Sequence, residues 1–159
     1  MIPKNTQLTT MSAYCQQGAL AYFRYMMHKF LADSMVGDVA RNMRILGYDT
    51  EYYSDMTQVD TLHYAITTGR IILTKNQKLC RYARDVCIIY AATTHDIMKK
   101  VIAVFNISTD IMVDKTRCTI CNGEQRKFDD KKMQCTSCNK IYWDGTHVVH
   151  MRHTAERWA

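Results

Sequence analysis

The sequence predicts an α/β protein in which a parallel sheet flanked by helices precedes a small module with four cysteines. Between residues 28 and 106, short apolar runs alternate four times with stretches of helical period, and the connections are short. This alternation is typical of a parallel sheet covered by helices on both faces. Two Cys-x-x-Cys pairs follow, at residues 118–121 and 135–138. A chain of 159 residues is long enough for one hydrophobic core and one satellite module.

The first third of the chain predicts an extension, a strand and a helix. Residues 1–27 form the N-terminal extension, within which residues 12–27 favour a helix. HKFLAD, at 28–33, predicts a short buried strand, and the next helix spans residues 34–47. Gly47 supplies the C-terminal stop of that helix. Its core face is expected to hold the apolar residues that recur at helical spacing: Val36, Val39, Ala40, Met43 and Leu46.

The middle of the chain predicts two more strands with a helix between them. YDTEYY, at 48–53, predicts the second strand, and RIILT, at 70–74, predicts the third. Thr57 is a suitable N-cap for a helix that runs to about Thr68, and Gly69 closes it. The residues of this helix that are expected to face the core are Val59, Leu62 and Ile66.

The last part of the α/β region completes the alternation. Residues 77–85 predict a short helix, VCIIYA at 86–91 predicts the fourth strand, and residues 95–106 predict the fourth helix of the alternation. A linker at about 106–115 leads to the cysteines. The α/β domain is therefore expected to span residues 28–114.

Cys118, Cys121, Cys135 and Cys138 predict a structural zinc site. The two pairs are separated by thirteen residues and supply four thiolates that can close a tetrahedron around Zn²⁺. The alternative, two disulfides, requires an oxidising compartment, and the N-terminal residues do not resemble a secretion signal. Because sulfur takes all four positions, no catalytic role is expected. Residues 115–159 are expected to form a zinc ribbon with a basic C-terminal tail.

The balance of charge favours a polyanionic partner. The net charge is +6, and residues 115–159 hold nine basic against five acidic residues. Such an excess is typical of nucleic-acid binding, although it also serves solubility alone. No apolar run approaches the ~18 residues that span a bilayer, so no membrane partner is expected. The scattered cysteines favour a reducing compartment, and thus a cytoplasmic location.

Four aspartates are candidates for a second metal site, where Mg²⁺ or Mn²⁺ would activate water for phosphodiester hydrolysis. Asp33 ends the first strand, Asp38 lies one turn further on, Asp60 lies early in a helix and Asp96 begins another. Each has an alternative interpretation: Asp33 and Asp96 as helix caps, and Asp38 and Asp60 as solvated charges. Asn76 follows the third strand, where catalytic side chains of α/β proteins are usually mounted.

Two blocks of the sequence resemble a known family. KFLADSMVGDVARNMRILGYD followed by GRIILTKNQKL is similar to the PIN-like ribonuclease domain found at the C-terminus of the Mut-seven exonuclease family. CTICNGE followed by CTSCNKIYWDGTH resembles the zinc ribbon attached to that domain, and the similarity covers roughly residues 29–153. The resemblance implies a PIN-like α/β fold, a four-cysteine zinc ribbon and metal-dependent cleavage of RNA by clustered acidic residues.

The resemblance also assigns roles to single positions. Asp33 matches the family's first metal-binding aspartate, Asp60 falls where an acidic residue is usual, and Asp96 is a candidate for another. Asn76 stands where the family normally has aspartate, so the acidic set is incomplete. Asp38 stands where the family more often has lysine, and it is a possible compensation for the lost carboxylate.

We therefore expect a protein that binds RNA or a ribonucleoprotein, with the ribosome as the leading particle. The alternatives are an active Mg²⁺- or Mn²⁺-dependent ribonuclease and a protein-binding adaptor. The sequence does not specify the oligomeric state. The side chains expected to contact RNA are Arg41, Arg44, Lys78, Arg81 and Arg84 near the cleft, and Arg126, Lys127, Lys131, Lys132, Trp143 and Arg152 on the ribbon.

Overall fold

The predicted parallel sheet is confirmed. The structure is a computed structural model that describes residues 28–83 and 86–159. Its larger sheet has four parallel strands in the order β2-β1-β3-β4. The strands are β1 (Phe30–Ala32), β2 (Thr50–Tyr52), β3 (Ile71–Thr74) and β4 (Ile88–Tyr90). The helix expected within residues 12–27 lies outside the described residues.

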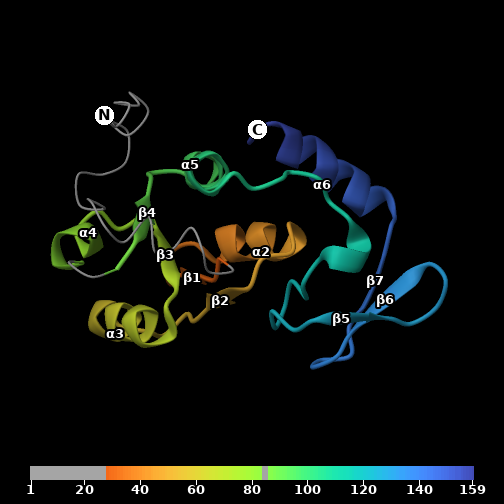
Figure 1. Cartoon of the computed structure of the whole chain (residues 1–159), viewed down its shortest axis with the longest axis horizontal. Helices are drawn as coiled ribbons and strands as arrows, with labels where there is room; N and C mark the ends of the chain where they lie inside the picture. Colours follow the sequence, from red (N-terminus) through yellow and green to blue (C-terminus); the bar gives the residue numbers. More distant parts are fainter. Residues whose placement is uncertain (1–27, 84–85) are drawn as a thin grey trace, which may run out of the picture.

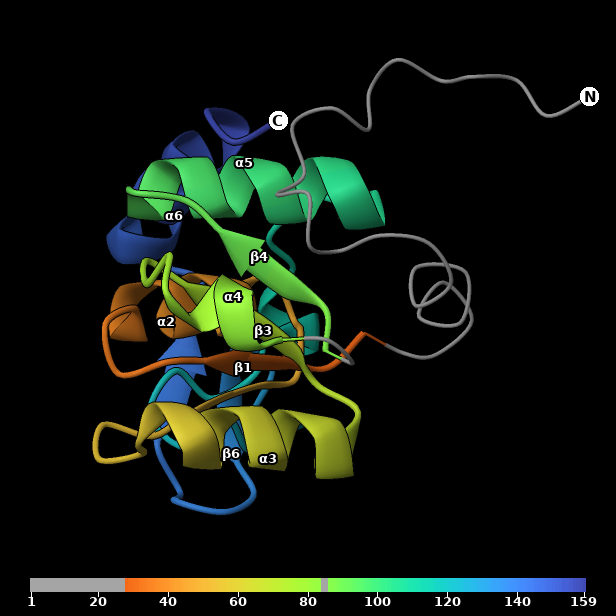
Figure 2. The same cartoon turned by 90° about the vertical axis from the view of Figure 1, so that its left-hand side faces the viewer.

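Helices cover both faces of this sheet (Figures 1 and 2). They are α2 (Gly37–Ile45), α3 (Gln58–Thr68), α4 (Leu79–Tyr82) and α5 (Thr94–Phe105). One buried cluster joins α2 and α5 to one face, and a second, smaller cluster joins α3 and α4 to the other. Figure 2 shows α5 and α3 on opposite sides of the strands.

The strands alternate their side chains between the two clusters. Phe30 and Ala32 of β1 point into the larger cluster, whereas Leu31 between them points into the smaller one. β3 repeats the pattern, with Ile71 and Ile72 on opposite faces. Because successive side chains of a strand face opposite ways, a sheet covered on both faces needs continuous apolar runs. This explains why β1 (FLA) and β3 (IILT) do not alternate apolar with polar residues.

The helix α3 faces the sheet with a different side from the one predicted. Val59 and Ile66 are 74% and 55% exposed, so the prediction that they face the core is wrong. Thr61 and Ala65 are buried instead, with Leu62 packed beside them. Thr61 and Ala65, four residues apart, therefore form the side of α3 that packs toward the sheet. The Thr57 cap and the Gly69 stop are both confirmed.

Two glycines at helix ends both have positive φ, but only one of them lacks room for a side chain. Gly47 has φ of +92°, and a Cβ there would lie 2.7 Å from the carbonyl oxygen of Lys115. Gly69 has φ of +65°, with nothing within 4 Å of such a Cβ. We expect Gly69→Ala to lower the free energy of unfolding by about 1 kcal/mol, from backbone strain alone. Gly47→Ala adds a clash with backbone and should cost on the order of 3 kcal/mol.

Urea denaturation of both variants checks this prediction. Equal losses for the two variants would mean that the Gly47 loop moves freely away from Lys115.

The cysteine module is a three-stranded antiparallel sheet in the order β5-β6-β7. It comprises β5 (Gln125–Lys127), β6 (Lys132–Cys135) and β7 (Ile141–Trp143), and the short 3-10 turn η2 (Val113–Lys115) leads into it. The next element is a helix, α6 (Thr146–Glu156), at a place where the sequence suggested only a basic tail. Ala155 and Trp158 are buried in the larger core cluster, so the chain returns to the α/β layer (Figure 1).

Among the helices of the described residues, none has the length and apolar character needed to cross a membrane.

Candidate functional site

The two Cys-x-x-Cys pairs form equivalent turns. In each, the first cysteine's carbonyl accepts from the N–H of an asparagine four residues on: Cys118 from Asn122 at 2.9 Å, and Cys135 from Asn139 at 3.1 Å. Both asparagines adopt the left-handed conformation, with φ of +64° and +62°. Asparagine tolerates this conformation better than most residues. The residue after each pair is thus part of the motif.

The four sulfurs are positioned to bind one metal ion. All lie within 4.8 Å of one another. The Cys118–Cys138 and Cys121–Cys135 sulfurs are 3.5 and 3.4 Å apart. A tetrahedron with Zn–S bonds of about 2.3 Å places its sulfurs about 3.8 Å apart. The donor set and its spacing therefore fit a tetrahedral thiolate site.

The surroundings lower the pKa of two of the four thiols, Cys118 and Cys135, and raise the pKa of the other two, Cys121 and Cys138. Burial would raise the pKa of the Cys118 thiol, but hydrogen bonds from the Tyr142 hydroxyl and from the N–H groups of Cys121 and Ile120 lower it to about 6. Burial and hydrogen bonding to the other thiols raise the pKa of Cys121 to about 12. Four thiolates this close repel one another, and a divalent cation relieves that repulsion.

Arg44 joins the first cysteine turn to the α/β layer. Its side chain is buried, and the guanidinium donates to the carbonyls of Thr119 at 3.0 Å, Ile120 at 3.2 Å and Thr50 at 2.8 Å. The expectation that Arg44 contacts RNA is therefore corrected, because its donors are used inside the protein. The asparagine of the same turn, Asn122, donates to Asp49 at 2.7 Å and accepts from the Thr50 N–H at 3.0 Å.

Asp33, Thr74 and Asn76 meet at the carboxyl ends of β1 and β3. Asp33 is 9% exposed; one carboxylate oxygen accepts from the Met35 N–H at 2.9 Å, and the other accepts from the Thr74 hydroxyl. The Thr74 oxygen in turn accepts from the Asn76 N–H at 2.8 Å. The Asn76 amide oxygen accepts from the Lys78 N–H at 3.0 Å. One chain of hydrogen bonds therefore holds the buried carboxylate and the asparagine.

Asp60 and Asp96 occupy matching positions at two helix starts. Each accepts from a threonine hydroxyl three residues earlier at 2.6 Å, Asp60 from Thr57 and Asp96 from Thr93. The same threonines accept from the aspartate N–H groups, which completes a reciprocal capping arrangement. Asp38 accepts from the Thr94 hydroxyl and thereby joins α2 to α5. Both capping carboxylates are exposed and belong to helices on opposite faces of the sheet.

The structure does not bring the predicted acidic residues together as one metal cluster. Within residues 28–83 and 86–159, the four cysteines are the only group of three or more histidine, cysteine or acidic side chains close enough to share an ion. Asp60 lies on the α3 face, whereas Asp96 and Asp38 lie on the α2 and α5 face. Asp33 accepts from the Thr74 hydroxyl at the carboxyl ends of β1 and β3. Sequence analysis missed Thr74, whose position before Lys75-Asn76 gave no distinct signal.

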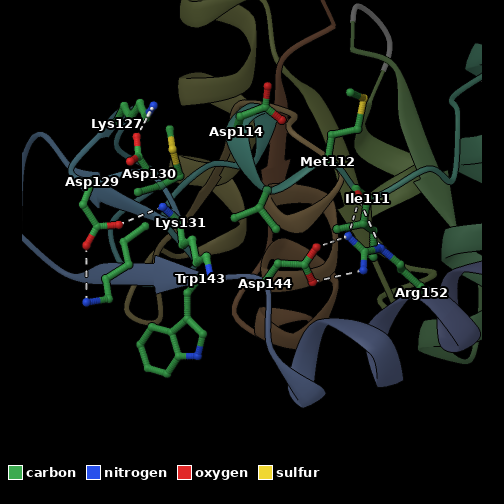
Figure 3. A pocket seen from close by; sticks show the side chains of 13 residues that line it. Ile111, Met112, Asp114, Lys127, Asp129, Asp130, Lys131, Trp143, Asp144 and Arg152 are labelled. Atoms are coloured by element: carbon green, nitrogen blue, oxygen red, sulfur yellow. Dashed lines mark hydrogen bonds and ion pairs between the residues drawn. The ribbon is translucent and has the colours of Figure 1, made fainter.

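The predicted RNA-contacting residues divide into two groups. Near the sheet edge, Arg41, Lys78 and Arg81 are exposed, and Arg84 lies outside the described residues. On the ribbon, Arg126 is exposed and donates to Gln134 at 3.0 Å. The remaining five ribbon residues line a single groove of about 910 Å³, shown in Figure 3: Lys127, Lys131, Lys132, Trp143 and Arg152.

Comparison with known proteins identifies one match. The family model described as the Mut7-C RNAse domain matches residues 28–155. Curated proteins and solved structures gave no match to the chain. The matched range includes both the acidic residues at the sheet edge and all four cysteines.

Proposed function

The chain belongs to the Mut7-C RNAse domain family, and on that premise we propose that it binds RNA or a ribonucleoprotein through a nuclease fold whose acidic site is incomplete. The observation that carries the proposal is the position of Asn76. It stands where the resemblance places an aspartate, beside the hydrogen bonds of Asp33 and Thr74. Its amide oxygen caps the turn that leads to α4 and carries no charge.

A site of this composition is poorly suited to phosphodiester cleavage. Such cleavage needs a divalent cation, Mg²⁺ or Mn²⁺, held by several carboxylates so that it can activate water. Asp33 is the buried carboxylate at this edge, while Asp60 and Asp96 cap helices. Loss of a ligand or its support commonly lowers metal affinity or activity by about 10–100-fold. Binding with little cleavage is therefore the favoured activity.

Zinc is the metal proposed for the four cysteines. A closed set of four thiolates selects zinc over Mg²⁺ or Mn²⁺, which prefer oxygen ligands. Zinc there has a structural role, since no coordination position is left for water or substrate. The thiolates require a reducing compartment, which is why we place the protein in the cytoplasm.

The ribosome is the particle we favour. It is the most abundant ribonucleoprotein of the cytoplasm, and a small basic protein with a zinc ribbon suits its crevices. Co-sedimentation of the tagged protein with ribosomal particles in a sucrose gradient tests this assignment. Recovery only in the fractions of free protein would exclude it while leaving RNA binding to other partners in place.

Cleavage of a labelled structured RNA, with Mn²⁺ or with EDTA, tests the proposed activity. We expect wild-type protein to bind the RNA and leave it intact. Asn76→Asp restores a carboxylate next to Asp33 and should increase metal-dependent cleavage at least about tenfold. Gln77→Glu is the matched control, because it adds the same charge one residue away and should not cut.

Other outcomes of the RNA experiment would support one of the two alternative functions, an active ribonuclease or a protein-binding adaptor. Metal-dependent cutting by wild-type protein that disappears in Asp33→Asn would establish an active ribonuclease and overturn the proposal. Failure of the wild-type protein to bind any RNA would favour a protein-binding adaptor.

A further inference from the structure

The groove on the cysteine module lies between three separate segments. The β5–β6 hairpin lines one side, residues 111–114 line another, and the end of β7 with Arg152 of α6 completes the lining (Figure 3). Its volume of about 910 Å³ falls in the range of ligand-binding pockets. None of the residues at the Asp33 edge lines it, so it is separate from the acidic site.

An exposed tryptophan dominates the apolar part of the groove. Trp143 is 59% exposed and Met112 is 46% exposed, and both line the groove together with buried Ile111. A Cβ on Gly145 would lie 2.9 Å from the indole Nε1, so Gly145 packs against that edge of the ring. Figure 3 shows the rest of the indole projecting clear of the ribbon. A flat apolar surface held in this way is suited to stacking against a planar ligand.

The charges around the groove are balanced, and most are paired. Lys127 pairs with Asp130 at 3.0 Å, Lys132 with Asp129 at 3.3 Å, and Arg152 with Asp144 at 2.8 Å. These pairs are exposed and therefore weak, so a phosphate can replace a carboxylate as partner of a lysine. Within the described residues, the Lys131 ammonium has no ion pair.

The two walls differ in the sign of their net charge. The hairpin wall carries three lysines against two aspartates, whereas the rest of the lining carries two aspartates, Asp114 and Asp144, against Arg152 alone. A ligand that presents anionic groups to one wall and hydrogen-bond donors to the other fits this arrangement. Phosphates and base amino groups are such groups, and aspartate accepts from base amino groups in known nucleic-acid recognition.

We propose that this groove binds an unpaired base of single-stranded RNA, with Trp143 as the stacking surface and the hairpin lysines against the backbone phosphates. This inference rests on the proposed RNA-binding function and adds the substrate form and its place. Base faces in a duplex are covered by their neighbours, so only unpaired bases can stack on a side chain. Because the charges of the groove cancel, stacking rather than phosphate attraction should provide most of the selectivity.

Tryptophan fluorescence reports this contact directly. The chain has two tryptophans, and Trp158 is 4% exposed, so quenching by a stacked base would arise from Trp143. We expect a short oligocytidylate, whose bases carry an amino group, to quench wild-type fluorescence and an RNA duplex of the same length to leave it unchanged. With few phosphates contacted, the affinity should fall only shallowly as salt is raised.

Substitutions locate the site. Trp143→Ala should weaken oligocytidylate binding about tenfold, and Trp143→Phe should retain most of it. Phe128→Ala is the matched control, because Phe128 is 52% exposed on the same hairpin but does not line the groove. Its affinity should equal that of wild type. Because Trp158 is buried, its emission at short wavelength, together with unchanged metal content, shows that Trp143→Ala is folded.

Two results separate failure of this inference from failure of the proposed function. If wild-type protein binds RNA without quenching, and Trp143→Ala binds equally well, the groove is not the RNA site while RNA binding stands. This is also the result expected if the groove holds a protein segment. If wild-type protein binds no RNA by gel shift or fluorescence, both proposals fall together.

Discussion

Removing the metal should unfold the cysteine module and also weaken the α/β layer. Within residues 116–145, only Cys118 and Cys135 are buried, so this segment has no hydrophobic core of its own. A structural zinc contributes about 10–16 kcal/mol to the folding of small zinc modules. A chelator, or Cys135→Ser, should therefore abolish the antiparallel sheet, as followed by circular dichroism and by amide hydrogen exchange of β5–β7.

The effect should spread to α2 and β2 because the first cysteine turn is hydrogen-bonded to them. Loss of that turn leaves the Arg44 guanidinium without its partners at Thr119 and Ile120, and leaves Asp49 without the Asn122 amide. Each buried polar group left unpaired costs about 1–3 kcal/mol. Melting of the α/β layer should thus shift to lower temperature and recover when zinc is restored.

Two comparisons make this prediction specific. Arg44→Ala should lower the melting temperature of the metal-loaded protein. A chelator should then lower it further by less than in wild type, because the Arg44 hydrogen bonds to the first cysteine turn are already absent. An α/β layer that melts at the same temperature with and without metal would show that the two parts fold independently.

Arg70→Met should destabilise the protein on the order of 3 kcal/mol, because it leaves two carboxylates of the β2 edge without their cation. Arg70 is 6% exposed. Its guanidinium contacts both oxygens of Asp49, at 2.9 and 3.1 Å, and Glu51 at 2.8 Å. It also donates to the Phe30 carbonyl at 3.1 Å, which ties β1 to this group.

The stabilisation provided by Arg70 should depend on pH in a defined direction. Burial would raise the pKa of Asp49, but hydrogen bonds from Arg70 and Asn122 hold it below the ordinary value of 3.8. A depressed pKa means that the stabilisation is complete above that value and is lost as the pH falls through the folded-state pKa. As the pH falls from neutral through the folded-state pKa of Asp49, the free energy of unfolding should therefore decrease less for Arg70→Met than for wild type.

Urea denaturation across pH measures both effects. Arg41→Met is the control, because Arg41 is exposed on α2 and its removal should change stability by no more than about 0.5 kcal/mol. Equal stability of Arg70→Met and wild type at neutral pH would mean that water solvates the two carboxylates adequately.

Features that depend on neighbours within a few residues could be predicted from the sequence. The Thr57 cap, the Gly47 and Gly69 stops and the spacing of the two cysteine pairs are examples. Each rests on hydrogen bonds or backbone angles of a single turn, so the chemistry is present in the local sequence. The alternation of apolar runs with helical periods likewise determined the parallel sheet, because period and length distinguish strands from helices.

Features that depend on packing between distant segments could be predicted only in part. The sequence suggested only a basic tail where α6 lies, although Val148, Met151, Ala155 and Trp158 recur there at helical spacing. The return of α6 to the α/β core was not predictable, because nothing in the sequence specifies which surface receives that face. The buried face of α3 was wrong for the same reason: periodicity indicates one apolar side, but the side that packs toward the sheet holds the small residues Thr61 and Ala65.

By itself, then, the sequence determined the strands, the helix ends and the four cysteines, because apolar period, cap residues and the spacing of the cysteine pairs are all local patterns. Only the tertiary structure determined which charged side chains are buried and which lie close together. Arg44 is a surface residue by pattern, yet a turn 75 positions away covers it. Asp33 follows a strand, and Asp60 and Asp96 lie in the first turns of helices that cover opposite faces of the sheet; among the described residues they form no shared metal cluster. Side-chain burial and convergence depend on which segments pack together, and local sequence carries little of that information.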